Sequence, residues 1–315
     1  MGPHPWLNST SNVWVVDIGN SGIKVTLAHS TYNAAHAVLQ HGQLQWSTAQ
    51  VQRIWQATWK HADLDSATHN KTKVSLRSAN ECILDVDDPT WPTQMIDGVH
   101  ATFGLPPNTA PDAWLVSSVQ RRAWQNWSTQ LQLLRPQDKT TKFENHDLAW
   151  TLKVDYPDRV GTDRALAAWA AWNLLARCAP LVVIQAGTAI TVDAVDEEGA
   201  YAGGAILPGL RLTLNALAGG TDLLPHLTAA DSPAELPSLP GKNTEQAMLA
   251  GGVAAVIGGI EHLLRRYQSI WSPSIPIIIS GGNRAYLSPL LTYSTRVVDH
   301  LVLLGLCGLL NSNGK

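Results

Sequence analysis

The sequence predicts an α/β fold made of two duplicated domains around a cleft, and three observations support this. First, a strand-turn-strand segment opens each half of the chain, at 13–28 and again at 181–196. Second, each turn carries a glycine followed by a small polar residue, and these glycines, Gly19 and Gly187, lie 168 residues apart. Third, a length of 315 residues suits two domains, because a domain typically takes about 150 residues.

The composition is that of a globular chain, with 45% hydrophobic and 15% charged residues. The net charge of −3 offers no basic excess, so we expect neither nucleic acid nor an anionic membrane as partner. Cys82, Cys178 and Cys307 are far apart and odd in number, which favours a reducing compartment over a disulfide framework. The N-terminus lacks the charged and apolar regions of a secretory signal, and we expect no membrane-spanning segment. These features predict a cytoplasmic protein.

The N-terminal domain is expected at residues 1–150, with 1–12 as a flexible extension. Residues 29–112 are polar and rich in proline, and we expect one or two strands and a helix or two there. The other expected elements are a hairpin at 13–28, a strand at 113–119, a helix near 121–134 and a polar connection at 136–145.

The C-terminal domain is expected at residues 151–315. An alanine- and leucine-rich run from Thr162 predicts a buried helix that Pro180 ends. A long helix is expected to start at Asn243 or Thr244, both good N-caps, and to run to about Tyr267. The other expected elements are strands and a turn over 181–196, a short strand with a Pro-Gly loop at 203–210, a loop at 219–243, a strand and Gly-Gly turn at 276–283 and a helix at 300–310.

The first motif with chemical potential is the segment from Asp17 to Lys24. Its turn glycines allow backbone N–H groups to approach an anion, Asp17 can hold Mg²⁺ through water, and Lys24 can face phosphate charge. An ordinary Gly/Asn hairpin turn explains the same residues, and both interpretations stay open.

The second motif lies at the start of the buried helix, from Gly161 to Arg164. Asp163 in a first helical turn is expected simply because it offsets the helix dipole. Arg164 is unfavourable there unless it binds something anionic, and Gly161 allows a ligand to come close. We therefore favour a binding function over dipole compensation alone.

Two further glycine tips lie in the second half, at 186–191 and at 280–283. The first is a second phosphate-type turn, and the second suits a flat base or ribose. The chain contains neither a Walker A loop nor a Rossmann fingerprint, so a nucleotide has to be held by these tips.

Taken in order, the motifs resemble type III pantothenate kinase from Val13 onward, most weakly across 29–112. This family belongs to the superfamily of acetate and sugar kinases, heat-shock chaperones and actin. The resemblance implies two RNase H-like, actin-like ATPase domains, a homodimer, and transfer of the γ-phosphate of ATP to pantothenate in the first step of coenzyme A synthesis. The motifs are DIGNSGIK, GTDR, AGTAIT, GGAILPG, GKNTEQAMLAG and ISGGN.

The resemblance also implies a role for individual residues. Asp163 stands in the place of the catalytic base, and Arg164 can pair with the pantothenate carboxylate. Mg²⁺ is implied with ATP, through Asp17. The implied ATP-binding residues are Asp17, Ile18, Gly19, Asn20, Ser21, Gly22, Ile23, Lys24 and Thr188, and the implied substrate-binding residues are Gly161, Thr162, Asp163, Arg164 and Thr244.

Two positions depart from the family pattern. The family commonly has Tyr seven residues before the Gly of its GxDR motif, where this chain has Val154, with Tyr156 out of register. The family's second tip usually begins with Asp, a ligand of a monovalent cation, where this chain has Gln185. Gln185 therefore argues against dependence on K⁺ or NH₄⁺.

Two alternatives follow from these departures. One is a non-catalytic ATP-binding regulator on the same fold, which the loss of the cation ligand favours. The other is a kinase of another small hydroxy acid, which the lost Tyr leaves open. The presence of both Asp17 and Asp163 favours an enzyme.

Overall fold

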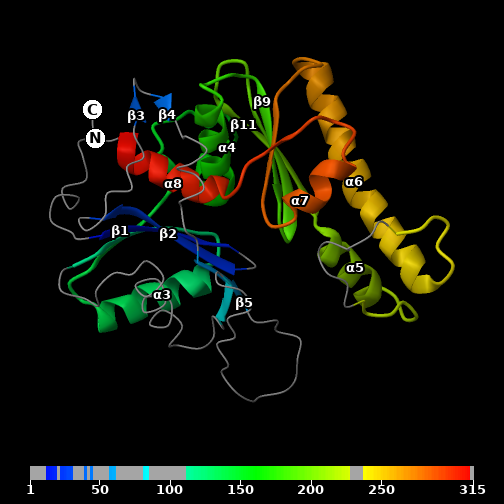
Figure 1. Cartoon of the computed structure of the whole chain (residues 1–315), viewed down its shortest axis with the longest axis horizontal. Helices are drawn as coiled ribbons and strands as arrows, with labels where there is room; N and C mark the ends of the chain where they lie inside the picture. The colour runs from blue at the N-terminus through cyan, green and yellow to red at the C-terminus, as the bar shows by residue number, and fades with distance from the viewer. Residues whose placement is uncertain are drawn as a thin grey trace. The chain divides into compact units, whose positions relative to one another are not determined.

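A computed structural model describes residues 12–19, 22–30, 39–40, 43–44, 57–61, 81–84, 111–227 and 237–312 (Figure 1). The chain divides into two compact units, each of which combines separate stretches of sequence. The first unit comprises 1–149, 158–166 and 302–315, and the second comprises 150–157 and 167–301. The expected division into domains 1–150 and 151–315 stays a prediction, and residues 1–11 lie outside the described part of the chain.

The first unit contains a six-stranded sheet in the order β6-β5-β2-β1-β7-β8. β1 is antiparallel to β2 and parallel to β7, while β8 continues the parallel side. A separate two-stranded sheet pairs β3 with β4. The strands are β1 (Asn12–Ile18), β2 (Gly22–Ser30), β3 (Leu39–Gln40), β4 (Gln43–Leu44), β5 (Ala57–His61), β6 (Glu81–Leu84), β7 (Ala113–Ser118) and β8 (Lys139–Lys142).

The second unit contains a five-stranded sheet in the order β11-β10-β9-β12-β13. Its first strand β9 is antiparallel to β10 and parallel to β12, as β1 is to β2 and β7. Five strands of the first sheet, β5-β2-β1-β7-β8, therefore have the same order and directions as β11-β10-β9-β12-β13. This repeat confirms the predicted duplicated RNase H-like fold. The strands are β9 (Leu181–Ala186), β10 (Ala189–Val195), β11 (Tyr201–Pro208), β12 (Ile277–Ser280) and β13 (Arg296–Val297).

The described α-helices lie between or after these strands in the chain. They are α3 (Arg121–Leu134), α4 (Thr162–Leu174), α5 (Leu210–Gly219), α6 (Thr244–Ile270), α7 (Arg284–Leu287) and α8 (Leu301–Ser312). Three short 3-10 turns complete the described helical segments, at Asn145–Asp147, Pro157–Arg159 and Ser288–Leu290.

The core of the first unit is rich in tryptophan. β1 is buried along its whole length, and α3 packs its apolar side along the sheet (Figure 1). Trp14 stacks on Trp114 with ring centroids 5.5 Å apart, and Trp114 meets the edge of Trp127 from α3. Three of the thirteen tryptophans therefore form the contact between sheet and helix.

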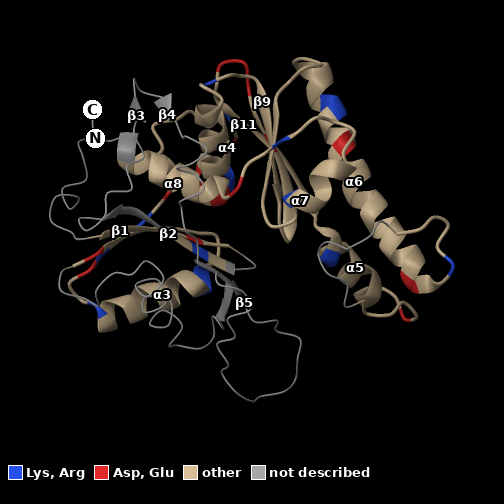
Figure 2. Ribbon diagram, viewed as in Figure 1, with Lys and Arg blue, Asp and Glu red and all other residues tan. Residues whose placement is uncertain are grey.

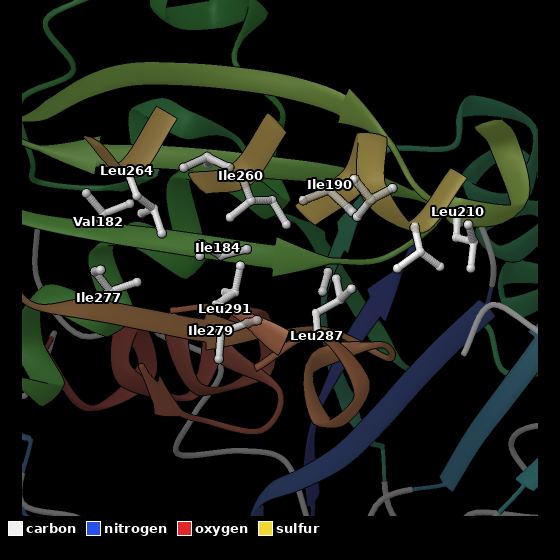
Figure 3. Close-up of a cluster of buried hydrophobic side chains, with 14 of the residues drawn as sticks. Val182, Ile184, Ile190, Leu210, Ile260, Leu264, Ile277, Ile279, Leu287 and Leu291 are labelled. Atoms are coloured by element: carbon white, nitrogen blue, oxygen red, sulfur yellow. The ribbon is translucent and has the colours of Figure 1, made fainter. Parts of the chain in front are cut away.

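The core of the second unit lies on one face of its sheet (Figure 3). Side chains of β9 and β12 point toward those of α6, and Leu210 of α5 joins them. The alternation of side chains places Gln185, Thr191 and Asp193 on the other face of the sheet. The labelled core residues are Val182, Ile184, Ile190, Leu210, Ile260, Leu264, Ile277, Ile279, Leu287 and Leu291.

The longest helix, α6, begins as predicted. The Asn243 side chain accepts a hydrogen bond from the Gln246 N–H at 2.8 Å, which caps the helix. By length and composition α6 passes as a membrane span, and its charged residues lie near its start and over about its last third (Figure 2). Its apolar face, including Val256, Ile260 and Leu264, is instead buried against the sheet, which is typical of a core helix.

Three predictions about elements were wrong in detail. The expected connection at 136–145 contains β8, an edge strand whose KTTK sequence lacks an apolar signal. Helix α5 was not predicted, because the Pro208-Gly209 pair that precedes it was interpreted as a loop. Helix α4 ends at Leu174 rather than near Pro180, because Ala176 and Arg177 adopt left-handed backbone angles.

Candidate active site

In the first unit, Asp17 lies next to the carboxyl end of β1 and is almost fully buried. Lys24 lies directly across the hairpin on β2, and its Nζ is 3.1 Å from Asp17 Oδ2. The Lys24 side chain remains one-third exposed and carries three N–H donors, so it can pair with Asp17 and still reach an anion. A pair of this kind orients the carboxylate and places positive charge beside it.

The hairpin tip is described only in part. Ile18, Gly19, Gly22 and Ile23 flank it, while Asn20 and Ser21, both predicted ATP ligands, lie outside the described residues. Ile18 and Ile23 are buried in the sheet and face each other in register. They therefore fix the hairpin, and any ligand contact at these two positions has to come from the backbone.

The second group of predicted residues forms the first turn of α4, also in the first unit. The Gly161 carbonyl accepts hydrogen bonds from the N–H groups of Arg164 and Ala165, at 3.0 and 3.2 Å. Asp163 Oδ1 accepts from the Arg164 N–H at 2.8 Å, so the carboxylate caps its own helix. A Cβ on Gly161 would come within 2.6 Å of that oxygen, so a larger residue there would displace the Asp163 carboxylate.

Ser117 on β7 connects these two groups, and it was not among the predicted site residues. Ser117 is the registered neighbour of Asp17 in the parallel pair β1–β7. Its hydroxyl lies 3.0 Å from the hydroxyl of Thr162, the first residue of α4, and both side chains are buried. The carboxyl ends of β1 and β7 and the start of α4 therefore meet at one edge of the sheet, which is the usual position of a ligand site in α/β folds. The Ser-Ser pair that ends β7 is the sequence signal for this position.

In the second unit, one backbone hydrogen bond joins the two predicted glycine tips, and another joins the first tip to Gly209 after β11. The Asn283 N–H donates to the Ala186 carbonyl at 2.9 Å, and the Gly209 N–H donates to the Thr188 carbonyl at 2.9 Å. Gly281 has a φ of +97°, and a Cβ there would lie 2.4 Å from the Ala186 oxygen. Only glycine permits this close approach, so the Gly-Gly turn and the Thr188 turn form one backbone surface.

The strand ends of the second unit repeat those of the first with different chemistry. Gln185 on β9 is registered with Ser280 on β12, as Asp17 is registered with Ser117. Across the hairpin, Gln185 faces Thr191 where Asp17 faces Lys24. The charged pair of the first unit thus corresponds to a neutral pair in the second.

This neutral set supplies no negative charge to the monovalent cation that the family resemblance implies. Gln185, Thr191 and Ser280 supply neutral oxygens, and the buried Thr191 hydroxyl has no hydrogen-bond partner in the structure. The described residues also contain no cluster of three or more His, Cys, Asp or Glu side chains able to hold a metal ion. By contrast, Asp17 offers the anionic oxygens that Mg²⁺ prefers.

The remaining predicted positions lie in the second unit. Thr244 is the first residue of α6 and is exposed beside the Asn243 cap. Val154 packs toward Gly203 on β11, where a Cβ would lie 3.4 Å from its methyl group, and Tyr156 is 62% exposed. Neither residue supplies a buried phenol at this point of the chain.

Comparison with known proteins identifies the family. The family model described as type III pantothenate kinase matches residues 90–266, more than half of the chain. The motifs at 17–24 and 279–283 lie outside that match.

Individual relatives agree with the family model. A type III pantothenate kinase of Rhodopirellula baltica is 42% identical over 165 residues, covering 51% of this chain and 58% of the relative. One from Albidiferax ferrireducens is 30% identical over 216 residues, covering 68% and 81%. The match thus spans little more than half the length of the first relative.

Among solved structures, the chain is similar to the ethanolamine utilization protein EutJ of Carboxydothermus hydrogenoformans. The TM-score is 0.42 at 13% identity, with 96% of this chain and 90% of that one covered. From the matched family model and its relatives, the chain belongs to the type III pantothenate kinase family.

Proposed function

We propose that this protein transfers the γ-phosphate of ATP to the primary hydroxyl of pantothenate, forming 4'-phosphopantothenate for coenzyme A synthesis. One observation carries the proposal: β1 with Asp17, β7 with Ser117 and the first turn of α4 with Asp163 meet at one sheet edge. This edge holds an acid suited to a metal–nucleotide and a second acid on a helix start. Relatives that share up to 42% of aligned residues are named type III pantothenate kinases.

ATP is held by the hairpin of the first unit, and a contact of ATP with Thr188 stays a prediction. Lys24 stabilises negative charge on the phosphates, and backbone N–H groups of the glycine turns bind their oxygens. Asp17 would hold Mg²⁺, which neutralises phosphate charge when it is bound. The Gly-Gly turn at 281–282 supports the nucleoside.

Pantothenate is held by the start of α4. Arg164 pairs with its carboxylate. The predicted contact of Thr244 with pantothenate stays a prediction. Asp163 orients the primary hydroxyl and takes its proton as the new bond forms. Its hydrogen bond from the Arg164 N–H fixes the carboxylate in one orientation for that task.

ATP, the substrate hydroxyl and Asp163 account for every bond that is formed or broken in the transfer. The hydroxyl oxygen forms a bond to the γ-phosphorus, the bond from that phosphorus to the β,γ-bridging oxygen breaks, and ADP leaves. The hydroxyl proton passes to Asp163. Because the transition state of phosphoryl transfer is loose, positioning and charge neutralisation supply most of the rate.

The proposal also concerns the oligomeric state and the cellular location of the protein. We expect a homodimer in the cytoplasm with ATP and pantothenate as ligands, and no nucleic-acid or membrane partner. Turnover is expected without K⁺ or NH₄⁺, because the Gln185 site contributes no negative charge.

A second candidate is a kinase of another small hydroxy acid. Val154 supports it, because this position contacts β11 through a methyl group and lacks the phenol that the family commonly has. A third is a non-catalytic ATP-binding regulator, which the neutral Gln185 site supports.

One assay separates the three candidates. Purified protein is given Mg·ATP, and ADP release is followed with pantothenate and with a panel of other hydroxy acids and sugars. The proposal predicts release that depends on pantothenate. Release with another acid alone would support the second candidate, and tight ATP binding without any release would support the regulator.

A further inference from the structure

The start of α4 needs a fixed position relative to β1 if Asp163 and Asp17 are to act on the same pair of substrates. Helix starts are held loosely by their own backbone, because the first N–H groups have no partner within the helix. The Asp163 carboxylate bonds to the next N–H of the same helix, so this contact does not tie the helix to the sheet. Some other contact has to set the position of α4.

The Ser117–Thr162 hydroxyl pair is such a contact. The two hydroxyl oxygens lie 3.0 Å apart, so the contact joins the carboxyl end of β7 to the first residue of α4. Ser117 is fully buried. On the other side, β7 is paired in register with β1, so that Ser117 is the neighbour of Asp17. A continuous path of strand pairing and one hydrogen bond therefore leads from Asp17 to the residue before Asp163.

A second contact supports the same segment from the loop before it. The Asn145 side-chain amide donates to the Val160 carbonyl at 2.8 Å, just ahead of Gly161. This bond fixes the approach of the chain to α4, while the Ser117–Thr162 pair fixes the first turn itself.

The second unit repeats the arrangement independently. Ser280 ends β12, the strand that corresponds to β7, and is registered with Gln185. Its hydroxyl accepts a hydrogen bond from the N–H of Leu301, the first residue of α8, at 3.5 Å. In both units, a serine near the carboxyl end of the strand that is parallel to the first strand contacts the start of a later helix. The strand is β7 and the helix is α4 in the first unit, and they are β12 and α8 in the second.

We infer that Ser117 is a positioning residue for phosphoryl transfer, which holds the first turn of α4, and with it Asp163, in place relative to Asp17. This inference rests on the proposed function. Ser117 acts through Thr162 and touches no reacting atom.

The test compares Ser117→Ala with Ser118→Ala. Ser118 is the matched control, because it is adjacent and its hydroxyl bonds only to the Gln120 backbone among the contacts that the structure gives it. Since a displacement near 1 Å can cost about 10²-fold in rate, we expect Ser117→Ala to lower kcat about tenfold and to raise the KM for pantothenate. The Kd for ATP, measured by calorimetry, should stay unchanged, and Ser118→Ala should keep the wild-type kcat.

A double-mutant cycle separates positioning from general loss of structure. Thr162→Val removes the partner hydroxyl and keeps the volume, so it should lower kcat by a similar factor. The double variant should then be no slower than either single variant, since the pair is already broken. Ser117→Thr, which keeps a hydroxyl, should recover most of the rate.

The results of these assays distinguish a failure of the proposed function from a failure of the inference about Ser117. A wild-type protein without pantothenate-dependent ADP release would overturn the proposed function itself. An active wild type with equal kcat in Ser117→Ala and Ser118→Ala, or with additive effects in the cycle, would overturn the inference. If Ser117→Ala fails to show a cooperative thermal transition, Thr162→Val and Ser117→Thr carry the same comparison.

Discussion

At the scale of single residues, Asp163 performs two tasks. It caps α4 through the Arg164 N–H, and in the proposed reaction it accepts the proton of the substrate hydroxyl. Asparagine keeps an oxygen for the helix cap and cannot take up the proton. Asp163→Asn should therefore lower kcat by about 10²-fold or more, the range of a general base, while ATP affinity and thermal stability stay near wild type.

The control for this variant is Asp163→Ala, which removes both functions. It should lose the activity and also some stability, because the first turn of α4 loses its cap. A near-wild-type kcat in Asp163→Asn would instead mean that Asp163 serves only the helix.

Gln185 gives a second prediction at this scale. A carboxylate at this position would attract a bound K⁺ by about 4 kcal/mol for charges 4 Å apart at an effective dielectric of 20, less the cost of its own desolvation. Glutamine contributes no such charge, so the wild type should turn over in a choline buffer without K⁺. Gln185→Asp should introduce or strengthen activation by KCl.

Choline chloride at the same ionic strength is the control for this measurement, because it matches charge screening without supplying a small cation. Strong activation of the wild type by KCl would show that other oxygens of the chain complete a cation site. Asp193, which lies on the same sheet face as Gln185, would then be the next residue to replace.

At the scale of elements, the ends of β1, β7 and β8 are held by a buried ion network. Arg135, just after α3, pairs with Asp112 and Asp138, and all three side chains are at most 5% exposed. Trp14 and Trp114 donate their indole N–H groups to the same two carboxylates, at 3.1 and 2.9 Å. The network thus connects the sheet, the helix and the tryptophan core.

Removing the cation leaves two buried carboxylates without a counter-charge. Arg135→Met should therefore lower the free energy of unfolding by about 3–5 kcal/mol, measured by urea denaturation. An unchanged free energy of unfolding in Arg135→Met would mean that the ion network adds no stability beyond its packing.

Lys153 provides the matched control, since it also bridges two acids, Asp196 and Glu198, but at the surface. Hydrogen bonds to Asp196 and Glu198 raise the pKa of Lys153 above 10.5. Because the pKa of Lys153 is higher in the folded state, its charge contributes stability at pH values below the pKa of the unfolded state. This contribution is lost as the pH rises through the pKa of the folded state. At neutral pH the pair is therefore fully formed, and Lys153→Met should still cost far less stability than Arg135→Met.

Elements with strong apolar patterns could be predicted from the sequence. The helix at Arg121–Leu134 was predicted with its observed bounds, and the Asn243 cap gave the start of α6. β8 could not be predicted, because an edge strand needs no apolar face and its KTTK residues carry no alternation. The end of α4 depends on two left-handed residues, Ala176 and Arg177, that are not glycines and give no signal in the sequence.

At the scale of the whole molecule, the duplication could be predicted from a single four-residue likeness between two turns. The strand orders confirm it over whole sheets. Among the described residues of the first unit, Asp17 and the predicted residues at the start of α4 also lie at one sheet edge. The part played by Ser117 was missed, because register between β1 and β7 exists only in the folded sheet. The cleft and the dimer stay predictions.

The central claim is that the chain phosphorylates the primary hydroxyl of pantothenate, and the product itself tests this most directly. After incubation with Mg·ATP and pantothenate, the proton-coupled ³¹P spectrum should show ADP and one new phosphate monoester. An ester on the primary hydroxyl neighbours a CH₂ group, so its signal should be a triplet, and it should be absent with Asp163→Asn over the same time. A doublet, from an ester on the secondary hydroxyl, or ADP with only inorganic phosphate would contradict the account.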